Sequence, residues 1–185
     1  MQISSNIEAL LSCCAIASLN KPKVIPKILI NLDALDLSKI REAFFKISTV
    51  IGLPKSINAL QELHEYTSRL NIKLIDPRPF ELLDGRILFD KVYARNSEKV
   101  LVKINQTYPL MTHLILNSYS SVLSQGGLLS EAETELAMIA SLYVQGGAVL
   151  SQCKSHELGA VNCGATSEDV KNAIRIADSM LQSKL

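Results

Sequence analysis

Apolar residues recur at intervals of three and four along most of this chain, and no sustained stretch alternates apolar with polar residues. The first period is that of an α-helix with one buried face, whereas a half-buried β-strand needs the second. The pattern therefore predicts an all-α protein. The predicted helices cover residues 5–19, 36–52, a segment from Pro54, 86–93, 98–105, 109–123, 130–144, 148–162 and 167–182, with one more that begins at Pro22 or Pro26.

Residue types at the ends of these segments support the same assignment. Side chains that accept hydrogen bonds from free backbone N–H groups precede several segments, and glycine follows others. The predicted caps are Ser5 with Glu8, Asp36, Ser130 with Glu133, and Thr166, and the predicted stops are Gly52 and Gly164.

The helical pattern lapses between Asn71 and Leu82, where Asp76-Pro77-Arg78-Pro79 excludes regular helix by fixing φ and restricting the residue before each proline. We therefore predict a first helical repeat over 1–70, a linker over 71–82 and a helical domain over 83–185. Residues 40–43 align with residues 170–173, and this frame places Pro26 opposite His156. Any two capped amphipathic helices align this well, so the repeat is one of two interpretations.

Composition excludes several classes of protein. The net charge is +1 and no basic run is present, which argues against nucleic acid and favours proteins or small molecules as partners. Four cysteines in 185 residues do not form a secreted disulfide framework, so we expect a cytoplasmic protein. The apolar run over residues 9–19 is shorter than the roughly 20 residues that span a bilayer, and no membrane contact is expected.

Three blocks in the second part resemble the carboxymuconolactone decarboxylase family, which includes the alkyl hydroperoxidase D-like proteins. They are Gly85–Tyr93, Gly126–Leu136 and His156–Thr166. Residues 39–43 and 52–60 are similar to the tail of another such repeat, so the chain resembles a tandem, partly degenerate member. The resemblance implies an all-helical bundle of that family's type, a homo-oligomer and loss of carbon dioxide from a lactone acid.

The sequence departs from the hydroperoxidase branch of that family at one motif. That branch carries Cys-x-x-Cys just before the histidine, and here Val149 and Gln152 stand at the two cysteine positions. Without two thiols no internal disulfide forms after attack on a peroxide. Cys153 is one residue out of frame, so peroxidase chemistry is disfavoured.

His156 is the predicted catalytic residue, because it shares a helix face with Cys153 and Ala160 and because histidine is the side chain suited to give and take a proton in one cycle. The resemblance to the family's Glu-Leu motif makes Glu135 its carboxylate partner. Each has a structural alternative: a packed histidine, a solvated glutamate, and for Cys153 a small apolar side chain rather than a reactive thiol. A zinc site at Cys153, His156 and Cys163 would lack a fourth ligand, so we predict neither metal nor cofactor.

Three functions remain open on this basis. The first is cofactor-free acid/base chemistry, decarboxylation or isomerisation of a small lactone or keto acid, through His156 and Glu135. The second is a non-catalytic oligomer that acts in assembly or partner binding. The third is thiol redox chemistry through Cys153. A structure in which His156 is buried and faces no cavity would favour the second.

Overall fold

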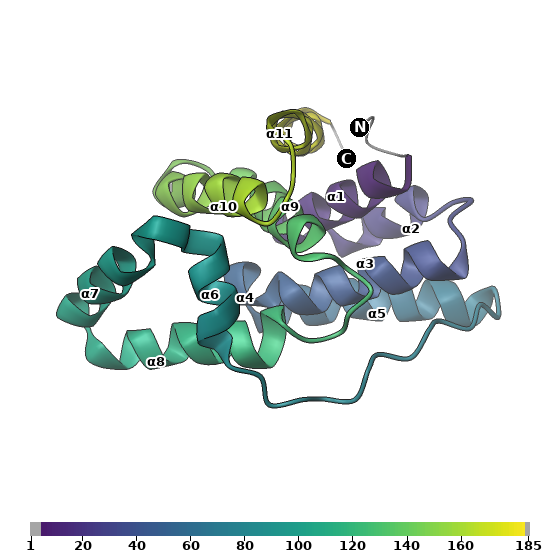
Figure 1. Cartoon of the computed structure of the whole chain (residues 1–185). Helices are drawn as coiled ribbons and strands as arrows, with labels where there is room; N and C mark the ends of the chain where they lie inside the picture. Colours follow the sequence, from purple (N-terminus) through teal and green to yellow (C-terminus); the bar gives the residue numbers. More distant parts are fainter. Residues whose placement is uncertain (1–4, 184–185) are drawn as a thin grey trace.

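The computed structural model describes residues 5–183 of the chain (Figure 1). Every regular element in that range is helical, so the predicted all-α class is confirmed. The elements are α1 (Ser5–Ser18), η1 (Pro22–Val24), α2 (Ile25–Ile28), α3 (Ala34–Lys46), α4 (Ser48–Ile51), α5 (Leu53–Arg69), α6 (Gly85–Tyr93), η2 (Ala94–Asn96), α7 (Ser97–Thr107), α8 (Pro109–Ser118), η3 (Tyr119–Leu123), α9 (Glu131–Tyr143), η4 (Gly147–Val149), α10 (Leu150–Asn162) and α11 (Ser167–Gln182).

Two helices far apart in the sequence, α1 and α9, form the centre of the molecule (Figure 1). Residues 10–18 of α1 and 134–142 of α9 are buried without interruption, so both helices are covered on every face. A helix that is apolar all round is stable only when neighbours surround it. α9 contacts α1, α10 and α11, and α1 also contacts α3 and α5. The hydrophobic core thus draws on residues before and after the predicted linker, and the division into a repeat and a domain stays a prediction.

Most predicted helix ends agree with the structure. Ser130 and Glu133 form a reciprocal capping box, as do Thr166 and Asp169. Gly164 follows α10 with a φ of 106°. The capping box predicted at Ser5 rests on side-chain atoms outside the described residues.

One predicted helix cap is wrong, and the helix predicted to begin at Pro22 or Pro26 is shorter than expected. The side chain of Asp33 accepts the hydrogen bond from the backbone N–H of Asp36, so Asp33 caps α3 and Asp36 lies within its first turn. Pro22 and Pro26 each begin only a short helix, η1 and α2. Pro26 therefore opens a single turn, whereas His156 lies in the middle of α10.

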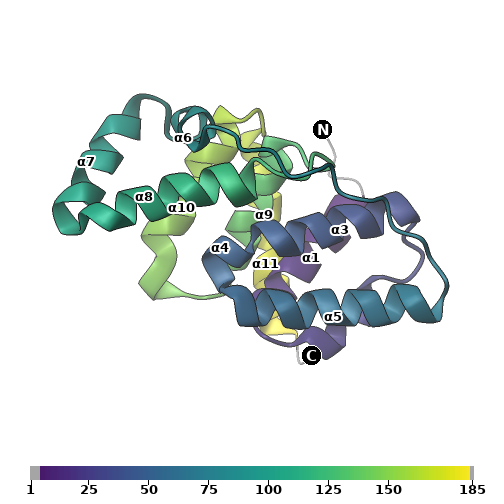
Figure 2. The ribbon, with the colours of Figure 1, turned by 90° about the horizontal axis from the view of Figure 1, so that it is seen from below.

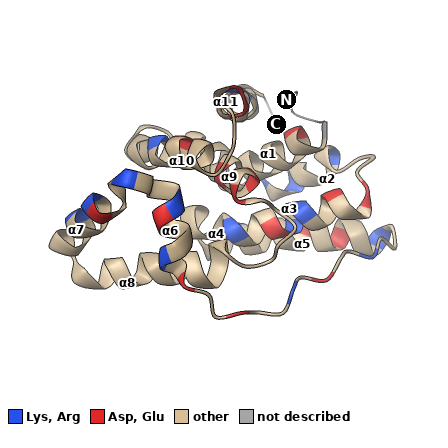
Figure 3. Ribbon diagram, viewed as in Figure 1, with Lys and Arg blue, Asp and Glu red and all other residues tan. Residues whose placement is uncertain are grey.

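The segment between α5 and α6 runs over the outside of the molecule without regular structure, as the prolines predict (Figure 2). Beyond it, α7 and α8 form a hairpin, residues 97–118, that extends away from the other helices in both views (Figures 1 and 2). We call this hairpin the α7–α8 arm. No residue of α8 is buried, and α8 carries no charged residue (Figure 3).

A buried carboxylate ties the first part of the chain to the loop before α9. Glu42 of α3 accepts hydrogen bonds from the backbone N–H groups of Gly127, Leu128 and Leu129, at 3.1, 2.9 and 3.2 Å. Its Oε1 also lies 3.2 Å from Nζ of Lys46. Burying a charge is costly unless it is paired and hydrogen-bonded, and here Glu42 is both.

The loop reaches Glu42 because it contains two glycines. Gly126 and Gly127 have φ values of 92° and 93°, in the region that disfavours residues with a Cβ. A Cβ on Gly126 would lie 2.3 Å from Cδ of Glu42, closer than atoms can pack. Gly126 is therefore required by both its backbone conformation and the close approach of the carboxylate. Gly127 is required by its backbone conformation and by Arg78, whose Cζ would lie 2.8 Å from an added Cβ.

None of the helices within residues 5–183 combines the length and the apolar character that crossing a membrane requires.

We predict that Gly126→Ala destabilises the protein far more than Gly146→Ala, its matched control. Gly146 also has a positive φ, 82°, but no atom lies within 4 Å of an added Cβ. The control should lose only the conformational cost of about 1–3 kcal/mol, and Gly126→Ala should lose about 1–3 kcal/mol more through overlap with Glu42. Equilibrium unfolding in urea, followed by circular dichroism, measures both, and equal losses would show that Glu42 does not constrain the loop.

Candidate functional site

The structure brings together two of the three predicted site residues. Nδ1 of His156, in α10, lies 2.7 Å from Oε2 of Glu135, in α9. Both side chains are buried, with 11% of the histidine and 2% of the glutamate exposed. The pair bridges the contact between α9 and α10, although its two residues are 21 positions apart in the sequence.

A glycine makes room for this pair. Gly159 lies in α10 one turn after His156, and a Cβ there would be 2.5 Å from Oε2 of Glu135 and 2.7 Å from Cγ1 of Val92. Helix α10 can therefore approach both α9 and α6 closely only because position 159 has no side chain. The backbone carbonyl of Val92 also accepts a hydrogen bond from the amide of Asn162, at 2.8 Å.

Two tyrosines beside the pair were not predicted from the sequence. Tyr93 ends α6 and Tyr119 begins the π-helical segment η3, and both rings pack on Phe89, with centroid distances of 4.4 and 5.1 Å. Burial raises the pKa of each tyrosine, and the nearby charge of Glu135 adds to both shifts. Both hydroxyls are therefore neutral at physiological pH. The sequence does not distinguish these tyrosines, because each occupies one apolar position of a predicted helix. Only the structure shows that both rings pack on the same phenylalanine.

Cys153, the third predicted residue, takes no part in the pair. Its sulfur lies 3.9 Å from the carbonyl oxygen of Ile139 and 3.8 Å from Oε1 of Glu157. The side chain is buried, and that burial, with Glu157 adding to it, raises the pKa of the thiol to about 11. A protonated, enclosed thiol is a poor nucleophile, which argues against redox chemistry at this residue.

The charge of Glu135 acts on the thiol of Cys163. Burial raises its pKa to about 12, and Glu135 and Glu131 contribute while Lys91 opposes them. Within residues 5–183 no three His, Cys, Asp or Glu side chains are grouped as a metal site would need. The zinc arrangement considered for Cys153, His156 and Cys163 is therefore not formed.

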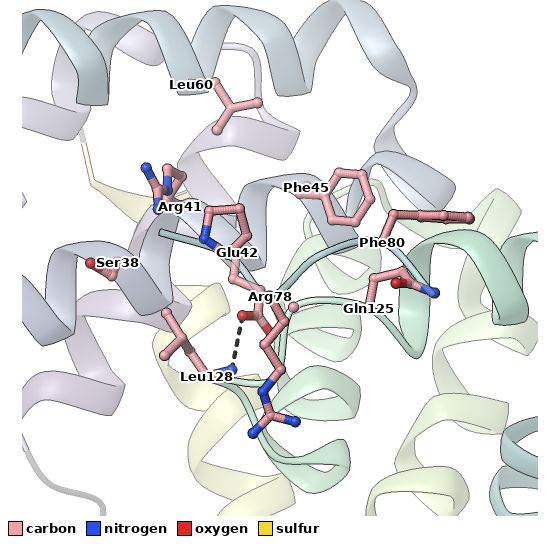
Figure 4. A pocket seen from close by; sticks show the side chains of 11 residues that line it. Ser38, Arg41, Glu42, Phe45, Leu60, Arg78, Phe80, Gln125 and Leu128 are labelled. Atoms are coloured by element: carbon pink, nitrogen blue, oxygen red, sulfur yellow. Dashed lines mark hydrogen bonds between the residues drawn. The ribbon is translucent and has the colours of Figure 1, made fainter. Parts of the chain in front are cut away.

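None of the cavities described here is lined by His156, Glu135 or Cys153. One cavity of about 470 Å³ lies between α3, α5, the segment before α6 and the loop that Glu42 holds (Figure 4). Its walls are mostly apolar and include Phe45, Leu60 and Phe80, with Arg41 and Arg78 beside them. The buried pair joins α9 to α10, and its catalytic role stays a prediction.

We predict that alkylation of Cys163 by iodoacetamide is slow at neutral pH and accelerates about tenfold per pH unit toward its pKa of about 12. The raised pKa keeps the thiol protonated, so the reactive thiolate grows with pH throughout this range. Mass spectrometry of the intact protein measures the rate, and free cysteine, with a pKa of about 8.5, is the control. A rate that levels off near pH 8 would contradict the assignment.

Comparison with known proteins identifies two relatives with the same name. The chain is 33% identical over 151 residues to Peroxisomal protein 2 of Schizosaccharomyces pombe, an alignment that covers 75% of this chain and 67% of the relative. It is 27% identical over 164 residues to Peroxisomal protein 2 of Saccharomyces cerevisiae, which covers 72% of this chain and 57% of that relative. No family model matches the chain.

These findings correct three expectations from the sequence. The assignment to the carboxymuconolactone decarboxylase family is wrong, because no family model supports it and the relatives carry another name. The predicted decarboxylase-like acid/base function is wrong for the same reason. The expected cytoplasmic location is contradicted by the same two names. At 33% identity over two thirds of the fission yeast protein, the chain belongs to the family of Peroxisomal protein 2.

Proposed function

We propose that this protein is imported into peroxisomes and acts there in assembly, by binding a second copy of itself, rather than as a decarboxylase. The observation that carries the assembly role is the α7–α8 arm, in which a helix rich in apolar residues leaves several of them exposed. The location is supported by the names of the two relatives and by a short motif in the sequence.

The motif is Ser183-Lys184-Leu185, the last three residues of the sequence. Ser-Lys-Leu at a free carboxyl terminus is an import signal for peroxisomes, which a receptor reads irrespective of the fold that precedes it. Helix α11 ends at Gln182, so the described part of the motif, Ser183, follows the last helical residue. The expectation of a cytoplasmic protein did not take this tripeptide into account.

The arm supports assembly through its exposed apolar side chains. Leu110 and Leu114 of α8 are 61% and 59% exposed, and Met111 lies between them in the sequence. Val102 and Tyr108 extend the same apolar character to α7 and the turn between the helices. Exposed apolar side chains gathered in one part of a protein are typical of interaction sites.

The occupant that fits α8 best is another α8. Helix α8 has no charged residue, so a partner surface must itself be apolar to avoid burying unpaired charge (Figure 3). A two-fold arrangement brings one patch against an identical patch, and it is the commonest symmetry of soluble oligomers. A second copy supplies this apolar surface without any further component.

The import proposal predicts that a fusion with a fluorescent protein before Met1 co-localises with a peroxisomal marker in yeast cells. Deletion of Ser183-Lys184-Leu185 should make the fluorescence diffuse, and so should one glycine added after Leu185, because the receptor needs the free carboxylate of that leucine. Gln182→Ala, one residue upstream, is the control and should be imported. Import that survives the deletion would show that the tripeptide is not the signal.

The assembly proposal predicts that the double variant Leu110→Glu/Leu114→Glu is a monomer of 20.3 kDa, while the unaltered protein at micromolar concentration has at least twice that mass. Two charges in the patch could not be buried without a large desolvation cost. Sedimentation equilibrium measures the mass, and circular dichroism verifies that helix content is retained.

Leu82→Glu serves as the matched control for that experiment, because Leu82 is 87% exposed but lies in the segment before α6, outside the arm. It should leave the mass unchanged. If the unaltered protein is itself a monomer, or if Leu82→Glu dissociates it equally, the arm is not the assembly surface.

A further inference from the structure

We propose that a cavity between α6, α7 and α10 binds a small anionic amphiphile, a molecule with a carboxylate or phosphate head and an apolar body. The cavity has a volume of about 590 Å³. That lies within the range of ligand pockets, roughly 300–1,000 Å³. We call it the cationic cavity.

The cations of this cavity are Arg95, Lys99 and Lys103. Lys99 and Lys103 lie one turn apart on α7, and Arg95 belongs to η2, the short turn that leads into α7. Figure 3 shows Lys and Arg positions along α7. None of the three forms an ion pair with a described residue, and no Asp or Glu lines the cavity.

The acidic residue nearest in the sequence does not balance these cations. Glu98, next to Lys99, pairs with Arg86 of α6. Like charges one helical turn apart repel each other, which costs stability unless an anion lies between them. A bound anion would remove that repulsion.

Apolar side chains also line the cavity. They are Val92 of α6, Val100 of α7 and Leu158 of α10, and Leu158 is 62% exposed. A cavity lined by both cations and aliphatic side chains favours a ligand that has both an anionic and an apolar part. Inorganic anions would use only the cations and neutral apolar molecules only the aliphatic side chains.

Two further residues of the lining stand out. Ala94, the first residue of η2, has a φ of 45°, a conformation that residues with a Cβ rarely adopt and that is held only when the surroundings require it. Tyr93, the adjacent residue, also lines the cavity, and burial together with the charge of Glu135 raises its pKa.

The cationic cavity shares α7 with the proposed assembly surface, but no residue of α8 lines it. Leu110→Glu/Leu114→Glu therefore changes the assembly surface without changing a residue of the cavity, so loss of dimerisation and loss of ligand binding are separable outcomes.

The test compares four probes with the full-length protein by isothermal titration calorimetry. Octanoate and octyl phosphate carry both a head and a tail, 1-octanol carries only the tail, and inorganic phosphate carries only the head. At least one of the two amphiphiles should bind about tenfold or more tightly than 1-octanol and than phosphate, and its binding should weaken as salt rises. The stronger of the two identifies the head group.

Variants assign the binding to this cavity. Lys99→Ala/Lys103→Ala should weaken binding of the amphiphile about tenfold, because each exposed lysine contributes a modest attraction. The matched control is Lys27→Ala/Lys73→Ala, which removes the same charge from exposed positions outside the cavity and should leave affinity unchanged. Because the chain has no tryptophan, the ultraviolet difference spectrum of tyrosine reports binding, and Tyr93→Phe should remove most of it.

Three results would overturn the proposal. They are absence of binding by both amphiphiles at millimolar concentration, equal binding of 1-octanol or phosphate, and an equal loss of affinity in the control variant. Retained helix content in each variant, measured by circular dichroism, separates loss of the site from loss of the fold.

Discussion

The burial of one carboxylate constrains how this chain folds. Glu42 lies in α3, and the three backbone N–H groups and the ammonium that satisfy it come from the loop before α9 and from Lys46. A carboxylate in this position without those partners would lose several kcal/mol to desolvation. Burial lowers the pKa of Lys46, and the charge of Glu42 opposes that shift, so the two ions depend on each other. Because the loop determines where α9 begins, and α9 contacts α1, α10 and α11, the placement of the central helix depends on this interaction.

The second buried polar contact, between His156 and Glu135, joins α9 to α10. Gly159 gives it space, and the charge of Glu135 contributes to the raised pKa of Tyr93 and of Tyr119. The features on which the proposals rest lie elsewhere, in helix α8, which has no Asp, Glu, Lys or Arg, and in the cationic cavity beside α7.

The sequence predicted the secondary structure well because the signals are local. A period of 3.6 residues, a capping side chain within three residues and a glycine stop act within one or two turns, and they located α9, α10 and α11 closely. The one wrong cap, Asp36 in place of Asp33, is a choice between two equivalent side chains three positions apart. The pairing of His156 with Glu135 was also predicted, but through a resemblance to a family to which the chain does not belong. Tyr93, Tyr119 and Cys163 were missed as neighbours of the pair, since nothing in their local sequence distinguishes them from other helical positions.

By itself the sequence determined the all-α class and the positions of most helices, and it also contains Ser183-Lys184-Leu185, the tripeptide on which the import proposal rests. Only the tertiary structure decided which apolar helices are covered. The segments that form α1 and α8 are both rich in apolar residues, yet residues 10–18 of α1 are buried on every face and no residue of α8 is buried. The composition of a helix fixes how much apolar surface it has, but burial depends on neighbours that are distant in the sequence. For the same reason the sequence could not show that Glu42 accepts its bonds from a loop 85 residues away, or that Arg95, Lys99 and Lys103 share a cavity without a counter-charge.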